Sequence, residues 1–88
     1  MCTSIVEIAQ IEGSGKAERG WIALTTSVVS YDHPHHAEYE EAISIDFMNV
    51  DLDPGVRVAV EISLESAKAF SEALRRAIKA AEALNKTA

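Results

Sequence analysis

The apolar residues of this 88-residue chain change their spacing at Ser63. Before Ser63, the segment 56–62 alternates valine or isoleucine with Arg57, Ala59 and Glu61, which is the period of a strand with one covered face. After it, apolar residues recur at three- and four-residue intervals over 64–84, which indicates an amphipathic helix. Ser63 is a suitable N-cap, and Glu65 suits the first turn. A chain that passes from strand to helix within one residue combines sheet and helix in one unit.

Three further strands precede this junction. Residues 43–48 alternate in the same way, and Asp53-Pro54-Gly55 supplies a turn between them and 56–62. Residues 2–12 and 21–31 are rich in β-favouring side chains and flank the polar segment 13–20. We therefore predict an α+β fold in the order β-β-β-β-α. It has a four-stranded antiparallel sheet of two hairpins and one C-terminal amphipathic helix across a face, and residues 1–88 form a single domain.

The register of the first hairpin follows from the position of its loop. If the loop centres near Lys16, antiparallel partners have residue numbers that sum to about 32. The predicted pairs are Val6 with Thr26, Ile8 with Leu24, and Cys2 with Ser30. In the helix, Phe70 and Leu74 occupy the middle of the apolar stripe, and we expect them to meet Phe47 and Val60.

The size of the chain and its apolar surface favour self-association. A domain of this size buries only about 60 to 65% of its unfolded surface, so an isolated copy is marginally stable. Both sides of the first hairpin carry apolar residues, among them Ile5, Ile11, Trp21 and Val29 on the odd-numbered side. We predict a homodimer or larger homo-oligomer with buried sheet surface. The alternative is that the segments 13–20 and 32–41 cover these residues.

Charge and hydropathy exclude several classes of partner. The formal net charge of −6 opposes binding to nucleic acid, which needs Lys and Arg to replace condensed counterions. No apolar run approaches the 18 to 20 residues of a membrane span, so we expect a soluble protein. The start of the chain lacks a basic region before its apolar residues, which argues against a secretory signal and predicts a cytoplasmic location.

All three histidines lie in the segment Tyr-Asp-His-Pro-His-His at 31–36. Imidazole is the commonest protein metal ligand and the usual proton carrier near neutral pH. A divalent transition metal, zinc or nickel, suits a site that combines these imidazoles with a carboxylate and the thiolate that the predicted register brings nearby. The candidate ligands are Cys2, Asp32, His33, His35 and His36. Two alternatives are a polar loop without a ligand and acid/base catalysis by a histidine.

A second candidate site is a polar face of the sheet. Asp46, Arg57 and Glu61 share one side of the second hairpin, and Glu7 is a candidate to join them from the first hairpin. These four residues either form ion pairs across neighbouring strands or line a pocket between subunits that binds a small-molecule ligand.

Several segments resemble a family of short, single-domain bacterial proteins of uncharacterised function. They include the opening Met-Cys-Thr-Ser-Ile-Val-Glu-Ile-Ala-Gln-Ile-Glu-Gly-Ser-Gly-Lys at 1–16 and Tyr-Asp-His-Pro-His-His-Ala at 31–37. The resemblance implies a self-contained domain and assigns no catalytic role. Two classes of function stay open: an oligomeric binding or accessory protein that holds a metal at Cys2 and the histidines, and a small enzyme that uses a histidine with Asp46 or Glu61 in a pocket between subunits.

Overall fold

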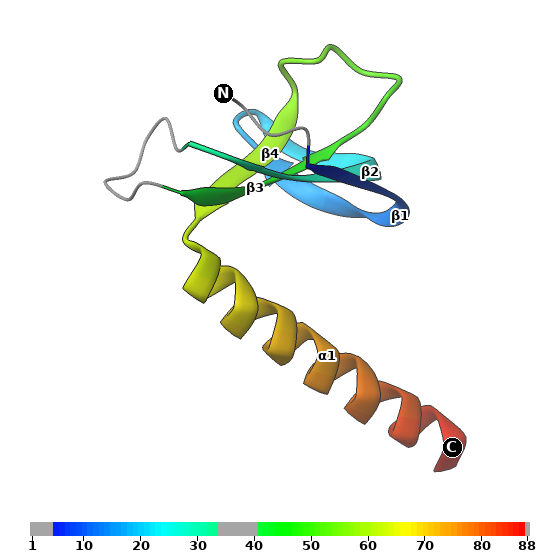
Figure 1. Cartoon of the computed structure of the whole chain (residues 1–88). Helices are drawn as coiled ribbons and strands as arrows, with labels where there is room; N and C mark the ends of the chain where they lie inside the picture. Colours follow the sequence, from blue (N-terminus) through cyan, green and yellow to red (C-terminus); the bar gives the residue numbers. More distant parts are fainter. Residues whose placement is uncertain (1–4, 34–40, 88) are drawn as a thin grey trace.

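A computed structural model describes residues 5–33 and 41–87 of the chain. It contains four strands and one helix: β1 (Val6–Ala17), β2 (Gly20–Asp32), β3 (Ala42–Met48), β4 (Arg57–Ile62) and α1 (Leu64–Thr87). The strands form one open antiparallel sheet in the order β1-β2-β3-β4, and α1 follows β4 directly (Figure 1). The predicted α+β fold with the order β-β-β-β-α is confirmed. Within the described parts of the chain, no helix has the length and apolarity needed to span a membrane.

The first hairpin is longer than its sequence suggests, and its predicted register is wrong. Val6 lies opposite Ser30 and Ile8 opposite Val28, four residues from the predicted partners. The cause is the Gly-Ser-Gly-Lys segment at 13–16, which is part of β1 and pairs with residues 21–24. The chain turns only at residues 18 and 19 and enters β2 through Gly20, whose φ of 130° is accessible mainly to glycine. The predicted pairing of Cys2 lies outside the described residues.

A β-bulge interrupts the pairing of β1 with β2. The register shifts between Gln10 and Gly13, so that Ile11 and Glu12 of β1 lie opposite the single residue Thr25 of β2. A bulge of this kind bends the strand and increases its local twist. The part of β1 beyond the bulge approaches β4, because a side chain at Gly15 would meet Val58.

The connection between β3 and β4 is tied to the middle of β2. The Thr25 hydroxyl donates to the backbone carbonyl of Met48 and accepts the N–H of Val50, and the Asn49 side-chain amide donates to the carbonyl of Ala23. These bonds hold the start of the connection against β2. The far end of the connection, at residues 53–56, lies beside the β1–β2 turn.

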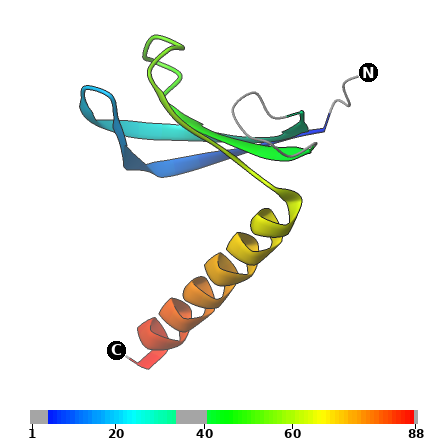
Figure 2. The same ribbon diagram turned by 90° about the vertical axis from the view of Figure 1, so that its left-hand side faces the viewer.

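The helix begins at a well-formed cap but does not lie across the sheet. The Ser63 hydroxyl oxygen accepts the N–H of Ser66, and the Ser63 carbonyl accepts the N–H of Ala67. With one residue between β4 and α1, the cap fixes the direction of the helix, which diverges from the sheet (Figure 2). Phe70 and Leu74 are each about half exposed. The prediction that they meet Phe47 and Val60 is therefore wrong for a single copy.

The core of one copy is small. Among the described residues, the buried apolar side chains are Leu24 and Ala42, and the buried polar ones are Thr26 and Ser27. The accessible surface is 7058 Å², whereas a compact folded monomer of this mass exposes about 5,000 Å². The radius of gyration is 15.0 Å, against about 12 Å for a compact domain of this length. One copy thus leaves surface uncovered that a compact domain would bury.

Candidate functional site

A hollow that bears charged side chains of both signs lies at the end of the sheet where two turns meet. It has a volume of about 490 Å³ and lies between residues 17–22 around the β1–β2 turn and residues 53–57 before and at the start of β4. Volumes of about 300 to 1,000 Å³ are typical of small-molecule sites. The apolar part of the lining includes Ala17, Ile22 and Val56, and the charged part includes Arg19 and Arg57.

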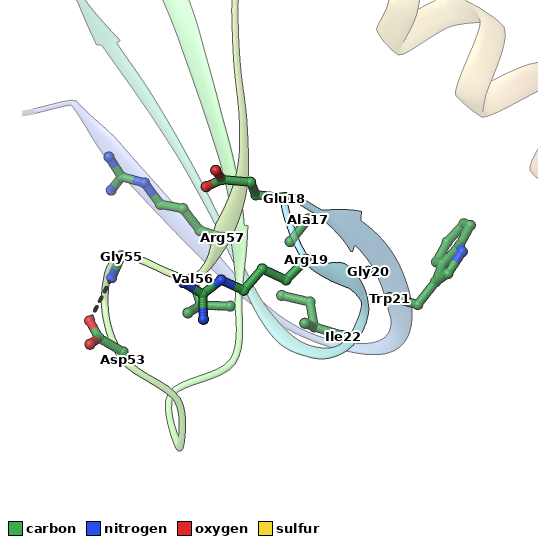
Figure 3. Close-up of a pocket in the computed structure, with 10 residues that line it drawn as sticks. All are labelled: Ala17, Glu18, Arg19, Gly20, Trp21, Ile22, Asp53, Gly55, Val56 and Arg57. Atoms are coloured by element: carbon green, nitrogen blue, oxygen red, sulfur yellow. Dashed lines mark hydrogen bonds between the residues drawn. The ribbon is translucent and has the colours of Figure 1, made fainter.

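The turn residues give this hollow its charged groups. The two-residue turn places Glu18 and Arg19 at the tip of the hairpin, and Figure 3 shows Arg19 reaching across toward Val56. On the other side, a carboxylate oxygen of Asp53 accepts the N–H of Gly55 at 3.0 Å and so shapes the turn that faces Arg19. Trp21 also lines the rim, but its ring points away from the other labelled side chains (Figure 3) and is 71% exposed.

The two arginines of the hollow differ in their partners. The Arg57 Nε lies 3.7 Å from a carboxylate oxygen of Asp46, its diagonal neighbour on β3. Half-exposed pairs of this kind contribute only about 0 to 1 kcal/mol to stability, but they orient the side chain. Arg19 has no hydrogen-bond or ion-pair partner among the residues that the structure describes. Its guanidinium therefore keeps its donors available for a ligand.

The structure divides the predicted polar face. Asp46, Arg57 and Glu61 do share one face of the sheet, because Asp46 pairs with Ala59, Met48 with Arg57 and Ser44 with Glu61. Glu7 lies on the opposite face, since the pairing runs from Glu7 through Val29 and Ile45 to Val60. The expectation that Glu7 joins the other three is therefore corrected by the strand register.

The histidine segment is described only in part. Asp32 ends β2, and its carboxylate accepts the backbone N–H of His33 at 2.7 Å. Cys2, His35 and His36 lie outside the described residues. Among residues 5–33 and 41–87, no three His, Cys, Asp or Glu side chains come together as a metal site. Asp32 and His33 by themselves offer too few ligands for zinc, which usually takes three or four from the protein. The zinc or nickel hypothesis stays a prediction.

A hydrogen bond joins β2 and the residue before β3 beside this segment. The Tyr31 hydroxyl donates to a carboxylate oxygen of Glu41. This hydrogen bond raises the pKa of the Tyr31 phenol above its ordinary value of 10.0, because ionisation would lose the bond and bring two negative charges together. The bond links the end of β2 to the residue before β3.

The hollow is not evident from the sequence. Arg19 was expected within a loop at 13–20, whereas it occupies the tip of an extended hairpin. The available signal was Gly20 after two charged residues, which marks a tight turn when φ is positive. No local pattern connects that turn with Asp53 and Gly55, which are more than thirty residues away and meet it only through the sheet.

The comparisons with known proteins identify a family and nothing narrower. A family profile described as a family of unknown function, DUF6295, matches residues 1–87. No curated protein and no solved structure matches the chain. The match covers nearly all of the 88 residues, so the chain belongs to the DUF6295 family of unknown function.

Proposed function

We propose that the protein is a small oligomeric binding protein that holds a small molecule with an anionic group in the hollow between the β1–β2 turn and residues 53–57. The observation that carries this proposal is Arg19, whose guanidinium lines the hollow and has no partner among the described residues. An unpaired guanidinium beside apolar side chains is a recognition element for carboxylate or phosphate, because its planar fork matches two oxygens at once.

The lining defines the rest of the ligand. Ile22 and Val56 provide apolar contact, and the volume of about 490 Å³ suits a ring or a short chain. The net charge of −6 repels anions at long range, so recognition rests on short-range contact with Arg19. Glu18 at the rim disfavours a second negative charge on the ligand. The ligand is therefore a monoanion with an apolar part.

Calorimetric titration tests the proposal without a reporter side chain, which suits this hollow because the Trp21 ring points away from the other lining residues (Figure 3). Benzoate and benzenesulfonate, both monoanions at neutral pH, are the probes, and benzamide is a neutral analogue of benzoate. We expect the two anions to give saturable heats of binding and benzamide to bind at least tenfold more weakly. A charge-assisted hydrogen bond contributes about 1.5 to 3 kcal/mol, which is about 10- to 150-fold in affinity.

Two variants distinguish a specific contact with Arg19 from a general attraction of anions to positive charge. Arg19→Ala removes the guanidinium and should abolish the preference for anions. Lys16→Ala removes an exposed cation of β1 that lies opposite Trp21 but does not line the hollow, and it should leave binding unchanged. Equal affinity for benzamide, or anion binding that survives Arg19→Ala, contradicts the proposal.

A further inference from the structure

Helix α1 presents an apolar stripe that its own sheet does not cover. Phe70, Leu74 and Ile78 are each 50 to 51% exposed, and Leu84 is 72% exposed. Their spacing places them on one side of the helix, whereas the charged residues occupy the other side. A helix of this kind gains most of its stability from packing of the apolar side, so the stripe needs a partner surface.

A matching surface lies on the sheet. A shallow hollow of about 400 Å³ at the start of α1 is lined by Ile43 of β3 and by Leu64, Ala67, Lys68, Ser71 and Glu72 of the helix. The first turns of α1 therefore face the side of the sheet that carries Ile43. By strand pairing, the same side carries an apolar row on β3 and β4: Ile43, Ile45, Phe47, Val58, Val60 and Ile62.

The two apolar surfaces meet at Ser63 and then separate. Figure 2 shows α1 leaving the sheet at an open angle, so that the later turns of the helix lie far from the strands. Val60 in the middle of the apolar row is 44% exposed. Each copy thus exposes two apolar surfaces: one side of α1, which no strand covers, and the β3–β4 apolar row, which the later turns of α1 do not cover.

The length of α1 exceeds what its own sheet requires. Its 24 residues span about 36 Å, whereas the seven residues of β3 span about 23 Å. The chain also exposes about 2,000 Å² more surface than a compact monomer of its mass, and a stable dimer needs about 800 Å² from each partner. The uncovered surface is therefore large enough for an interface between copies.

The charge of α1 indicates which kind of surface its apolar side contacts. Helix α1 carries five basic and three acidic residues, whereas residues 1–63 carry three basic and eleven acidic residues. Two helices of this sign repel each other over most of their length, but a basic helix and an acidic sheet unit attract. The sheet unit of another copy therefore offers α1 an apolar row together with a net negative charge.

We propose that two copies associate by reciprocal exchange, in which α1 of each copy lies on the β3–β4 apolar row of its partner. The arrangement is closed by two-fold symmetry, because the same two surfaces are used once in each direction. It rests on the oligomeric part of the proposed function and is independent of ligand binding at Arg19. It places Ile78 of one copy close to the β4 region of the other.

Crosslinking between single-cysteine variants tests this arrangement. Val60→Cys and Ile78→Cys are each made together with Cys2→Ser, so that every chain has one thiol. The two variants are mixed, allowed to exchange subunits and treated with a short bismaleimide. Intact mass spectrometry separates the mixed product from the two products of like chains. We expect a mixed Val60–Ile78 product of about twice the 9.5 kDa chain mass.

The matched control is Ala59→Cys, which neighbours Val60 on β4 but lies on the opposite face of the sheet. It should give at least fivefold less mixed product with Ile78→Cys. A yield equal to that from Val60→Cys, or products only between two Ile78→Cys chains, overturns the exchange and indicates helix–helix pairing. A 9.5 kDa species alone in light scattering at 100 µM overturns it as well, whereas calorimetry still reports ligand binding in either case.

Discussion

Gly15 provides the sharpest test of the strand register, because the structure leaves no room for a side chain there. It lies on β1 beyond the bulge, opposite Ile22 of β2. A methyl group built on Gly15 would lie 3.0 Å from a Leu24 methyl carbon and 3.1 Å from a Val58 methyl carbon. Optimal carbon–carbon contacts are about 3.5 to 4.0 Å, so Gly15→Ala forces both neighbours to move.

The expected magnitude follows from two opposing effects. Leu24 is buried and can retreat little, and overpacking of this kind costs about 1 to 3 kcal/mol. Replacing glycine by alanine within a strand recovers about 0.5 to 1 kcal/mol of chain entropy. We therefore expect Gly15→Ala to lower the free energy of unfolding by about 1 kcal/mol. Gly13→Ala is the matched control on the same face of β1, and it should stabilise by about 0.5 kcal/mol because no atom lies within 4 Å of its added methyl group.

Urea denaturation followed by circular dichroism, at one protein concentration for all variants, measures both changes. A Gly15→Ala variant as stable as Gly13→Ala would show that β1 does not pack against Leu24 and Val58 as described. A double-mutant cycle with Leu24→Ala gives a second check. Removal of the Leu24 methyl groups should lower the cost of Gly15→Ala and leave the part that is due to Val58, whereas an unchanged cost assigns the whole effect to Val58 or to the backbone.

Three further predictions concern other parts of the chain. In a Tyr39→Phe background, Glu41→Ala should lower the pKa of Tyr31 toward 10.0, as seen in the ultraviolet absorption of tyrosinate, and an unchanged titration would exclude the hydrogen bond. Since that pKa is raised in the folded state, the bond contributes stability below pH about 10 and loses it as the pH rises through the raised pKa. Phe70→Ala should raise the dimer dissociation constant at least tenfold in analytical ultracentrifugation, because the lost contact of about 100 Å² corresponds to about 2.5 kcal/mol, and an unchanged constant would place Phe70 outside the interface. If the histidine segment binds zinc or nickel, Cys2→Ser and His35→Ala should each weaken the affinity, which should also fall below pH about 6 as the ligands take up protons. Calorimetry that detects no binding tighter than millimolar at pH 7.5 would reject this site.

The type and order of the elements could be read from the sequence. The two-residue period of 56–62, the three- and four-residue spacing of 64–84 and the cap at Ser63 are properties of short windows of chain. The period with which side chains alternate depends only on local backbone geometry, so it is independent of long-range contacts. The shared face of Asp46, Arg57 and Glu61 was predictable for the same reason, because it needs only alternation along one hairpin.

The register of the first hairpin depended on contacts that no window contains. The segment 13–16 has the composition of a loop, yet it forms part of β1. Its glycine at position 15 accommodates Leu24 and Val58, which approach from two other strands. Composition alone cannot distinguish a glycine that permits a turn from one that makes room for a neighbour.

The sequence also determined which side of α1 is apolar, but only the tertiary structure decided what that side meets. The single residue between β4 and α1 directs the helix away from its own sheet, so Phe70 and Leu74 stay half exposed in one copy. The hollow at Arg19 also depends on tertiary structure. Hydrogen bonds of Thr25 and Asn49 hold the start of the β3–β4 connection against β2, and residues 53–57 lie beside the β1–β2 turn. The periodicity of apolar residues shows which side of one element must be buried. Which surface buries that side depends on the directions of the elements in space, and long-range contacts determine those directions.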